Sequence, residues 1–310
     1  MSNTVLTVSE DTLLKMKSHY QNSLQSKVPQ GGIFMAKPTG CTITAYKSGK
    51  VMFQGSNCDA EVSKWQGKSA SQTPKKVNPT NSNSTLPKNF SSLAVIGSDE
   101  VGTGDYFGPM AVVASFVDPS QFELLKELGV KDSKELTDDA ISSIAKKIMH
   151  VVTYSLLVLH NEKYNDMQEK GYNMNKLKAL LHNQAIRNTI SKLEGKTYDA
   201  ILIDQFTPPN LYYGYLKGTK EVIRDKVQFA TKAEGLHLSV AVSSILARYA
   251  FLQQMDKLSE KAGMTLPKGA GAKVDQAAAK LIKLKGFEAL RSLTKLHFAN
   301  TEKALKISKK

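Results

Sequence analysis

Almost wholly apolar runs alternate with amphipathic segments in the larger, C-terminal part of the chain. The apolar runs predict buried strands at residues 93–99, 109–117, 151–159, 200–204 and 227–229. Helical spacing predicts helices from Thr137 onward, at 173–193 and at 239–258, with a helical tail at 281–284 and 289–296. Strands that alternate with helices favour an α/β fold whose sheet is covered on both faces.

The first part of the chain has a different pattern. Ser9, a candidate N-cap residue, precedes Leu13, Met16, Tyr20 and Leu24, which recur at helical spacing. Three short β-like runs separated by turn residues follow, at 33–36, 42–46 and 51–54. One helix packed on an antiparallel sheet leaves the other sheet face free. That face is either a binding platform or the solvated side of a plain α+β domain, and the pattern leaves both open.

A polar segment separates the two parts. Residues 68–90 consist almost entirely of Ser, Thr, Asn, Gln, Pro and Lys. Such a segment cannot bury enough apolar surface to offset the entropy of ordering, so we predict a flexible linker. The chain is therefore predicted to hold an N-terminal α+β domain at 1–67, a linker at 68–90 and a larger domain at 91–310.

Composition narrows the function classes. The 310 residues carry 42 Lys and Arg against 28 Asp and Glu, a net charge of +14, which indicates a polyanionic partner. The charge is uneven: residues 91–260 hold 19 basic and 21 acidic residues, whereas 261–310 hold 12 basic and 3 acidic ones. This distribution suits an enzyme with an acidic centre and basic flanks. The basic tail is either a phosphate contact or a solvated helical face.

The lengths of the apolar runs and the number of cysteines bear on where the protein is located. No apolar run approaches the roughly 20 residues of a membrane span, and no secretory signal is recognisable, so we expect no membrane partner. Cys41 and Cys58 are the only cysteines, and neither a metal site nor a disulfide scaffold is expected from them. We therefore expect a cytoplasmic protein.

Carboxylates follow the predicted strands. Asp99 and Glu100 lie where the first strand of the larger domain is predicted to end, Asp204 ends a later strand, and Glu234 follows the 227–229 run. Acids gathered at strand ends repel one another unless cations neutralise them, and Mg²⁺ or Mn²⁺ prefers such oxygen ligands. The alternative is that Asp99 and Asp204 only cap or initiate turns.

Several other catalytic patterns are missing. The run Gly102-Thr103-Gly104 offers backbone N–H groups to a ligand or simply makes a tight turn, and no Gly-Lys-Ser/Thr follows it as in a P-loop. The six histidines show no zinc spacing and no serine-hydrolase elbow supports them, so we interpret them as surface or local structural groups.

The motifs as a set resemble those of the type 2 ribonucleases H. The resemblance rests on four segments in the same order, namely 97–104 with Gly108-Pro109, 132–136, 203–204 and 243–248. Within that group the chain is most similar to ribonuclease HIII. Gly-Thr-Gly stands where ribonuclease HII has Gly-Arg-Gly, Glu234 stands where it has Asp, and the N-terminal extension has the size of the TATA-binding-protein-like domain of that family.

The resemblance implies a ribonuclease H-like mixed sheet flanked by helices. It also implies an endonuclease that uses two Mg²⁺ or Mn²⁺ ions to cut the RNA strand of an RNA–DNA hybrid, leaving 3′-hydroxyl and 5′-phosphate ends. The metal ligands would be Asp99, Glu100, Asp204 and Glu234, and the substrate contacts would include Gly102, Thr103, Gly104, Ser133 and Lys134. Asp105 and Asp132 are rival acids; Asp132 is better explained as ordering the Ser133-Lys134 turn.

Three lysines complete the predicted substrate surface. Lys37, Lys47 and Lys50 lie on or near the sheet of the N-terminal domain, which we expect to grip the hybrid. We expect a monomer with no obligate protein partner. Two rivals remain: cleavage at single ribonucleotides embedded in DNA, as by ribonuclease HII, and a non-catalytic nucleic-acid-binding protein. The acidic centre argues against the second.

Overall fold

A computed structural model describes residues 2–29, 32–47, 49–55, 57–65, 86–87 and 89–309. The chain divides into two compact units, Met1–Asn83 and Ser84–Lys310, which are described separately. Most of the linker predicted at 68–90 lies outside the described residues.

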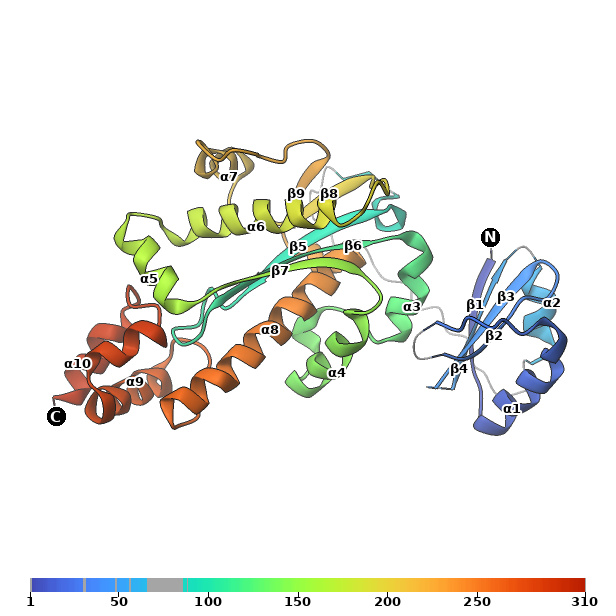
Figure 1. The fold of residues 1–310 in the computed structure, drawn as a ribbon, viewed down its shortest axis with the longest axis horizontal. Helices are drawn as coiled ribbons and strands as arrows, with labels where there is room; N and C mark the ends of the chain where they lie inside the picture. Colours follow the sequence, from blue (N-terminus) through green and yellow to red (C-terminus); the bar gives the residue numbers. More distant parts are fainter. Residues whose placement is uncertain are drawn as a thin grey trace. The chain divides into compact units, whose positions relative to one another are not determined.

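The first unit is an antiparallel sheet with helices on one face (Figure 1). Its strands have the order β1-β4-β3-β2 and its elements are β1 (Ser2–Thr7), α1 (Glu10–His19), β2 (Gly32–Ala36), β3 (Cys41–Tyr46), β4 (Lys50–Gly55) and α2 (Cys58–Ser63), with a 3₁₀ turn at Gln21–Ser23. The predicted helix and three strands are confirmed, and Ser9 caps α1 by accepting a hydrogen bond from the Thr12 amide. The sequence pattern did not reveal β1 and α2.

The face of this sheet opposite the helices is only partly free. Leu13, Met16 and Phe53 belong to the core that α1 and α2 cover. On the other face Val5 and Ile33 are exposed, but Thr44, Tyr46 and Met52 are buried. Met52 pairs with Thr44, and Thr44 with Met35, so long side chains flank the threonine. The described side chains on this face are therefore exposed at Val5 and Ile33 and buried at Thr44, Tyr46 and Met52.

The two cysteines, from which neither a metal site nor a disulfide scaffold was expected, form a single disulfide. Cys41 at the start of β3 and Cys58 at the start of α2 form a disulfide, with their Cα atoms 5.3 Å apart. The packing of α2 against the sheet brings them together, a tertiary contact that their separation in the sequence does not reveal.

The second unit contains a five-stranded mixed sheet of order β7-β6-β5-β8-β9. Its strands are β5 (Val95–Val101), β6 (Met110–Val117), β7 (Thr153–Leu159), β8 (Ala200–Asp204) and β9 (Val227–Ala230). β5, β6 and β7 pair antiparallel, whereas β5, β8 and β9 pair parallel. All five predicted strands are confirmed.

Helices cover both sheet faces, as predicted (Figure 1). α6 (Met174–Ser191) crosses one face and α8 (Leu238–Ala262) the other. The helix predicted from Thr137 is α4 (Asp138–Ile148), and it packs with α8. The remaining helices of this part are α3 (Phe122–Glu127), α5 (Asn161–Glu169) and α7 (Pro209–Tyr215), with short 3₁₀ turns at Phe90–Ser92, Pro119–Gln121, Ser133–Glu135 and Ala233–Gly235. Among the described residues, none of the helices is both long and apolar enough to cross a membrane.

Strand β5 runs further than the sequence pattern predicts. Asp99 and Glu100 were expected at its end, but the ladder with β6 continues to Val101, which pairs with Ala111. The two acids therefore lie within the strand and point to opposite faces. Gly97 faces α8, where an added Cβ would lie 2.4 Å from the backbone of Ser239 and Val240.

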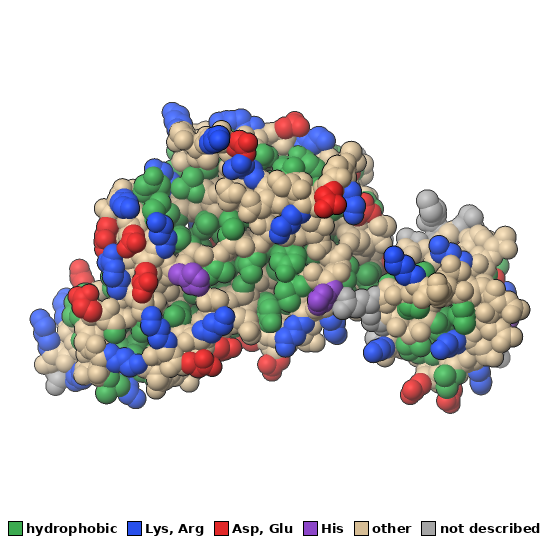
Figure 2. Space-filling model, viewed as in Figure 1, with side chains coloured by type: hydrophobic (Ala, Val, Ile, Leu, Met, Phe, Trp, Pro, Cys, Tyr) green, Lys and Arg blue, Asp and Glu red, His purple; other side chains and the backbone are tan. Residues whose placement is uncertain are grey.

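The C-terminal part packs beneath the loop that follows β5. It consists of α9 (Ala272–Lys285), a 3₁₀ segment (Phe287–Ser292) and α10 (Asn300–Ser308), which share a core with Tyr106 and Phe107 of that loop. Lys295 is fully buried and donates hydrogen bonds to the carbonyl oxygens of Asp105 (2.7 Å) and Gly108 (2.6 Å). Burial lowers the pKa of Lys295 to about 7. On the face drawn in Figure 2, basic side chains of this unit are scattered among acidic ones.

Candidate active site

Asp99 is the most buried acid of the site. It lies in β5 on the face covered by α8, is 6 % exposed, and interacts with the Ser244 side chain. Burial raises the pKa of Asp99 well above its ordinary value, and the nearby negative charge of Glu100 raises it further. The charges of Asp204 and Glu234 act in the same direction. This carboxyl group is therefore surrounded by other acids, and a cation would stabilise its charged form.

Glu100 lies on the other face of the strand, against α6. Its carboxylate forms an ion pair with the Lys178 ammonium and contacts Nε2 of His182 at 2.8 Å. Burial opposes ionisation, but the contacts with His182 and Lys178 outweigh it, and the pKa of Glu100 lies below its ordinary value. Glu100 is thus held as a carboxylate.

Asp204 ends β8, beside β5. Its Oδ1 accepts a hydrogen bond of 2.9 Å from the amide of Ala233. Burial raises the pKa of Asp204 even though this hydrogen bond lowers it, and the charge of Glu100 raises it further. Parallel pairing of β5 with β8 brings Asp204 near Asp99 and Glu100, as the sequence predicted.

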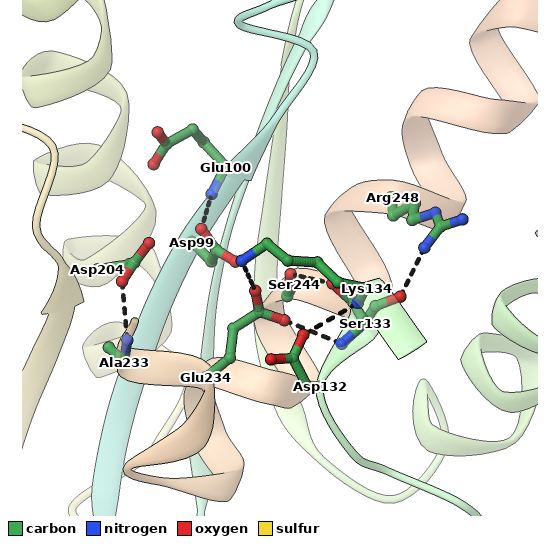
Figure 3. Close-up of polar contacts among 10 residues, drawn as sticks. All are labelled: Asp99, Glu100, Asp132, Ser133, Lys134, Asp204, Ala233, Glu234, Ser244 and Arg248. Atoms are coloured by element: carbon green, nitrogen blue, oxygen red, sulfur yellow. Dashed lines mark hydrogen bonds and ion pairs between the residues drawn. The ribbon is translucent and has the colours of Figure 1, made fainter. Parts of the chain in front are cut away.

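Glu234 enters from the 3₁₀ turn after β9. Its Oε2 accepts a 3.0 Å hydrogen bond from the Ser133 amide, and its Oε1 pairs with Nζ of Lys134 at 2.9 Å (Figure 3). Burial opposes ionisation of Glu234, but the contacts with Lys134 and Ser133 together outweigh it and the pKa is lowered. Lys232 begins the turn with φ of 56°, a left-handed conformation. The four predicted carboxylates therefore gather in one region (Figure 3).

The Ser133-Lys134 turn is fixed from several sides. The Asp132 side chain accepts a hydrogen bond from the Lys134 amide, which is the ordering role predicted for it. Ser133 Oγ lies 2.9 Å from Ser244 Oγ, and Arg248 of α8 donates to the Ser133 carbonyl at 2.6 Å. The motif at 243–248 thus supports the turn at 132–136.

The glycine loop combines a structural and an accessible part. Gly102 has φ of +94°, and an added Cβ would lie 2.2 Å from the Pro109 carbonyl oxygen. Gly104 is exposed, with nothing within 4 Å of an added Cβ, and Thr103 is half-buried. The rival acid Asp105 accepts a 2.6 Å hydrogen bond from the Gly269 amide. Of the predicted glycines, Gly104 is the one left open to a ligand.

Sequence reasoning missed a polar cluster on the α6 face. Lys178 is buried, and His182 is fully buried, although the histidines were expected at the surface or in local structure. Ser98 Oγ lies 2.6 Å from His182 Nδ1, and the imidazole stacks on Phe206. The spacing of Lys178 and His182, four residues apart on a helix, is the signal in the sequence that places both on one face.

The donor set suits a hard divalent cation. Among the described residues, no three His, Cys, Asp or Glu side chains stand close enough together to hold an ion as they are. Two of the four carboxylates already have cationic partners, since Lys178 pairs with Glu100 and Lys134 pairs with Glu234. Four converging carboxylates match the oxygen ligands that Mg²⁺ and Mn²⁺ prefer.

Comparison with known proteins identifies the family. The Ribonuclease HII family model matches residues 96–301, and a domain of unknown function, DUF3378, matches residues 3–78. Ribonuclease HIII of Bacillus cereus (strain ATCC 14579) is 58 % identical, covering 99 % of both chains. Ribonuclease HIII of Bacillus subtilis (strain 168) is 56 % identical over 100 % of this chain and 99 % of its own.

Solved structures give the same assignment. Bst-RNase HIII in complex with Mn²⁺ superposes with a TM-score of 0.71 at 44 % identity, covering 99 % of both chains. Ribonuclease H2 from Pyrococcus horikoshii OT3, at 23 % identity and a TM-score of 0.55, covers 70 % of this chain and all of its own and supports the fold alone. The chain belongs to the ribonuclease HIII family, the metal-dependent endonucleases that cut the RNA strand of RNA–DNA hybrids.

Proposed function

We propose that Asp99, Glu100, Asp204 and Glu234 hold two divalent cations, Mg²⁺ or Mn²⁺, with which this ribonuclease H hydrolyses the RNA strand. The observation that carries the proposal is the gathering of these four carboxylates in one region of the site (Figure 3), where burial and the three other acids also raise the pKa of Asp99. A buried cluster of mutually repelling carboxylates is costly unless cations neutralise it. When bound, paired cations lower the pKa of the attacking water and stabilise the leaving 3′-oxygen.

The protein's own groups orient the carboxylates. The Ala233 amide fixes Asp204, the Ser133 amide fixes Glu234, and Ser244 contacts Asp99. Hydrogen-bonded partners of this kind keep a metal-ligating carboxylate in its orientation and in its charged form. No protein nucleophile takes part in this proposal, and the products are a 3′-hydroxyl and a 5′-phosphate.

The substrate side of the site is formed by the open part of the glycine loop and by the Ser133-Lys134 turn. The Lys134 side chain is 74 % exposed, and its ammonium pairs with Glu234 in the field of the Asp132 and Asp99 charges. It can therefore exchange Glu234 for a phosphate when a nucleic-acid strand arrives. Thr103 and Gly104 present backbone groups beside the acids, where a ribose 2′-hydroxyl is read in this proposal.

The N-terminal unit is proposed to hold the hybrid through its rim. Lys50 lies in β4 on the face of Met52, Lys47 directly follows β3, and Lys37 directly follows β2 at the opposite end of the sheet. The proposed contact is electrostatic and strengthens binding without reading sequence. We also propose that the protein acts as a cytoplasmic monomer, with the hybrid as its partner.

Cleavage of a labelled RNA–DNA hybrid tests the catalytic proposal. The wild type should cut the RNA strand with Mn²⁺ or Mg²⁺ and stop when a chelator is added. Asp99→Asn keeps the shape of the side chain but removes its charge, so it should abolish cleavage and leave hybrid binding intact. Near wild-type rates in Asp99→Asn would refute the assignment.

Salt dependence of binding tests the N-terminal surface. Replacing Lys37, Lys47 and Lys50 with alanine should weaken hybrid binding and flatten the dependence of its affinity on salt, because each phosphate contact contributes about one unit to that slope. The matched control is Lys15→Ala with Lys17→Ala on α1, which covers the other sheet face. An unchanged slope in the triple variant would reject this surface.

The Gly-Thr-Gly loop, which stands where ribonuclease HII has Gly-Arg-Gly, makes the preferred substrate a question for experiment. Ribonuclease HII-type cutting at a single ribonucleotide in DNA is the alternative, and a duplex carrying one ribonucleotide distinguishes them. We expect uniform hybrids to be cut far faster than this substrate. The reverse preference would favour the alternative, and binding without any cutting would favour a non-catalytic protein.

A further inference from the structure

One buried lysine inside the acidic site is unexplained by the roles assigned so far. Lys178 of α6 is 7 % exposed, and its ammonium forms an ion pair with Oε1 of Glu100. The same ammonium lies 4.0 Å from the centre of the Phe206 ring, in a cation–π contact. A lysine is almost never buried unless it is paired, so its charge belongs to the site.

The position of Glu100 does not depend on Lys178 alone. His182 contacts the other carboxylate oxygen of Glu100 at 2.8 Å, and the imidazole is itself fixed by Ser98 and by stacking on Phe206. The two partners of Glu100 are therefore held by different contacts: Ser98 and Phe206 fix the imidazole against one carboxylate oxygen, and Lys178 places an ammonium beside the other.

The second lysine of the site behaves differently. Lys134 pairs with Glu234 from the solvent side, with 74 % of its side chain exposed, whereas the Lys178 side chain is 9 % exposed. Lys134 can leave when a cation or a phosphate arrives. Lys178 is enclosed by Glu100, Phe206 and its own helix, so its charge stays where it is.

We propose that Lys178 is a resident cation of the acidic site, which neutralises Glu100 in the absence of a divalent ion and weakens the binding of divalent ions by the nucleic-acid-free protein. The inference rests on the proposed function, because it takes Glu100 as a metal ligand. A fixed ammonium within a few ångströms repels an incoming cation strongly in a poorly solvated site. The substrate phosphate then supplies the negative charge that restores full occupancy of the site.

Mn²⁺ binding to the full chain without nucleic acid tests this proposal, by calorimetry and by electron paramagnetic resonance of free Mn²⁺. Lys178→Met removes the charge and leaves His182 on Glu100, so the Mn²⁺ dissociation constant should fall about tenfold or more. Lys178→Gln, a second neutral variant, should act in the same direction. Lys178→Arg keeps the charge and should stay within about twofold of the wild type.

Lys176→Met is the matched control, because it removes the same charge from the same helix. Its ammonium lies over the Tyr172 ring and does not contact Glu100. It should leave the dissociation constant within about twofold of the wild type. Melting curves of each variant report whether the fold is intact.

The possible results separate the two proposals. Asp99→Asn should weaken Mn²⁺ binding; if it does not, the metal assignment fails and the Lys178 proposal fails with it. If Asp99→Asn weakens binding but both neutral variants at position 178 bind Mn²⁺ with unchanged or lower affinity, only the Lys178 proposal is overturned. Equal tightening by Lys176→Met would also overturn it, because general surface charge would then explain the effect.

Discussion

The two faces of the central sheet treat neighbouring acids in opposite ways. On the α8 face, Asp99 is buried near other acids and its pKa is raised; on the α6 face, Glu100 contacts Lys178 and His182 and its pKa is lowered. The two residues are adjacent in β5. Because side chains alternate along a strand, two consecutive acids can supply one carboxylate that needs cations and one that already has a partner.

The largest expected effect is on the rate of hybrid cleavage, and it comes from removing the charge of one carboxylate of the site. Glu100→Gln and Asp204→Asn should each lower the rate of hybrid cleavage at least about 1000-fold, equivalent to about 4 kcal/mol. The measurement is single-turnover cleavage at saturating Mn²⁺. Asp139→Asn is the control, since Asp139 lies in the first turn of α4. A small effect in Glu100→Gln would leave the α6 face outside the catalytic machinery.

On the α8 face of the sheet, the backbone of β5 packs directly against the backbone of α8 at Gly97. A side chain at this position would disrupt that packing. An added Cβ would lie 2.4 Å from backbone atoms of Ser239 and Val240, so Gly97→Ala should lower the free energy of unfolding by about 3 kcal/mol. Urea denaturation measures it. Gly214→Ala in α7, where nothing lies within 4 Å, should cause no loss. Equal stabilities would mean that α8 can move away without cost.

Polar side chains close the α6 face instead, and His182 connects them. His182→Leu removes a partner of Ser98 and of Glu100 inside the protein, and should lower the free energy of unfolding by about 2 kcal/mol. His150→Leu changes an exposed histidine and should have almost no effect. If the two variants unfold alike, the contacts of His182 do not stabilise the fold.

The smallest expected effect has the opposite sign. The folded-state pKa of Asp99 lies above its ordinary 3.8, so between these values the folded protein binds more protons than the unfolded chain, and stability falls as pH rises. Asn cannot titrate, so Asp99→Asn should be more stable than the wild type at pH 7 without divalent cations, by about 1 kcal/mol.

Thermal melts from pH 3.5 to pH 8 with a chelator would measure this difference. The two proteins should converge at the acid end, and added Mn²⁺ should remove the advantage of the variant by stabilising the wild type. A wild type that is the more stable protein at pH 7 under chelation would contradict the repulsion described for Asp99.

Local patterns were enough to predict most elements. The apolar runs of β6 and β8 and the capping residues Ser9 and Thr137 act over a few residues, and the structure confirms them. β1 escaped prediction because Ser2–Thr7 is rich in Ser, Asn and Thr and forms a strand by pairing with β4. The end of β5 was misplaced for the same reason, since pairing with β6 extends it past the acids.

The order of the sequence motifs predicted the four carboxylates of the site, but it did not predict the residues that contact Glu100. The gathering of Asp204 and Glu234 near Asp99 follows from the parallel pairing of β5 with β8 and of β8 with β9. Lys178 and His182 looked like ordinary positions of an amphipathic helix, because their role depends on which face of α6 meets β5. The Cys41–Cys58 pair depends in the same way on how α2 packs.

Lys295 has a consequence for the order in which the protein matures. Its buried amine holds the carbonyl groups of Asp105 and Gly108, beneath the loop that borders the acids, yet it follows all four carboxylates in the chain. When Asp99 and Glu234 have left the ribosome, Lys295 has not yet been added, so the loop still lacks its two hydrogen bonds. The nuclease therefore acquires its finished loop only after the segment carrying Lys295 has left the ribosome and folded.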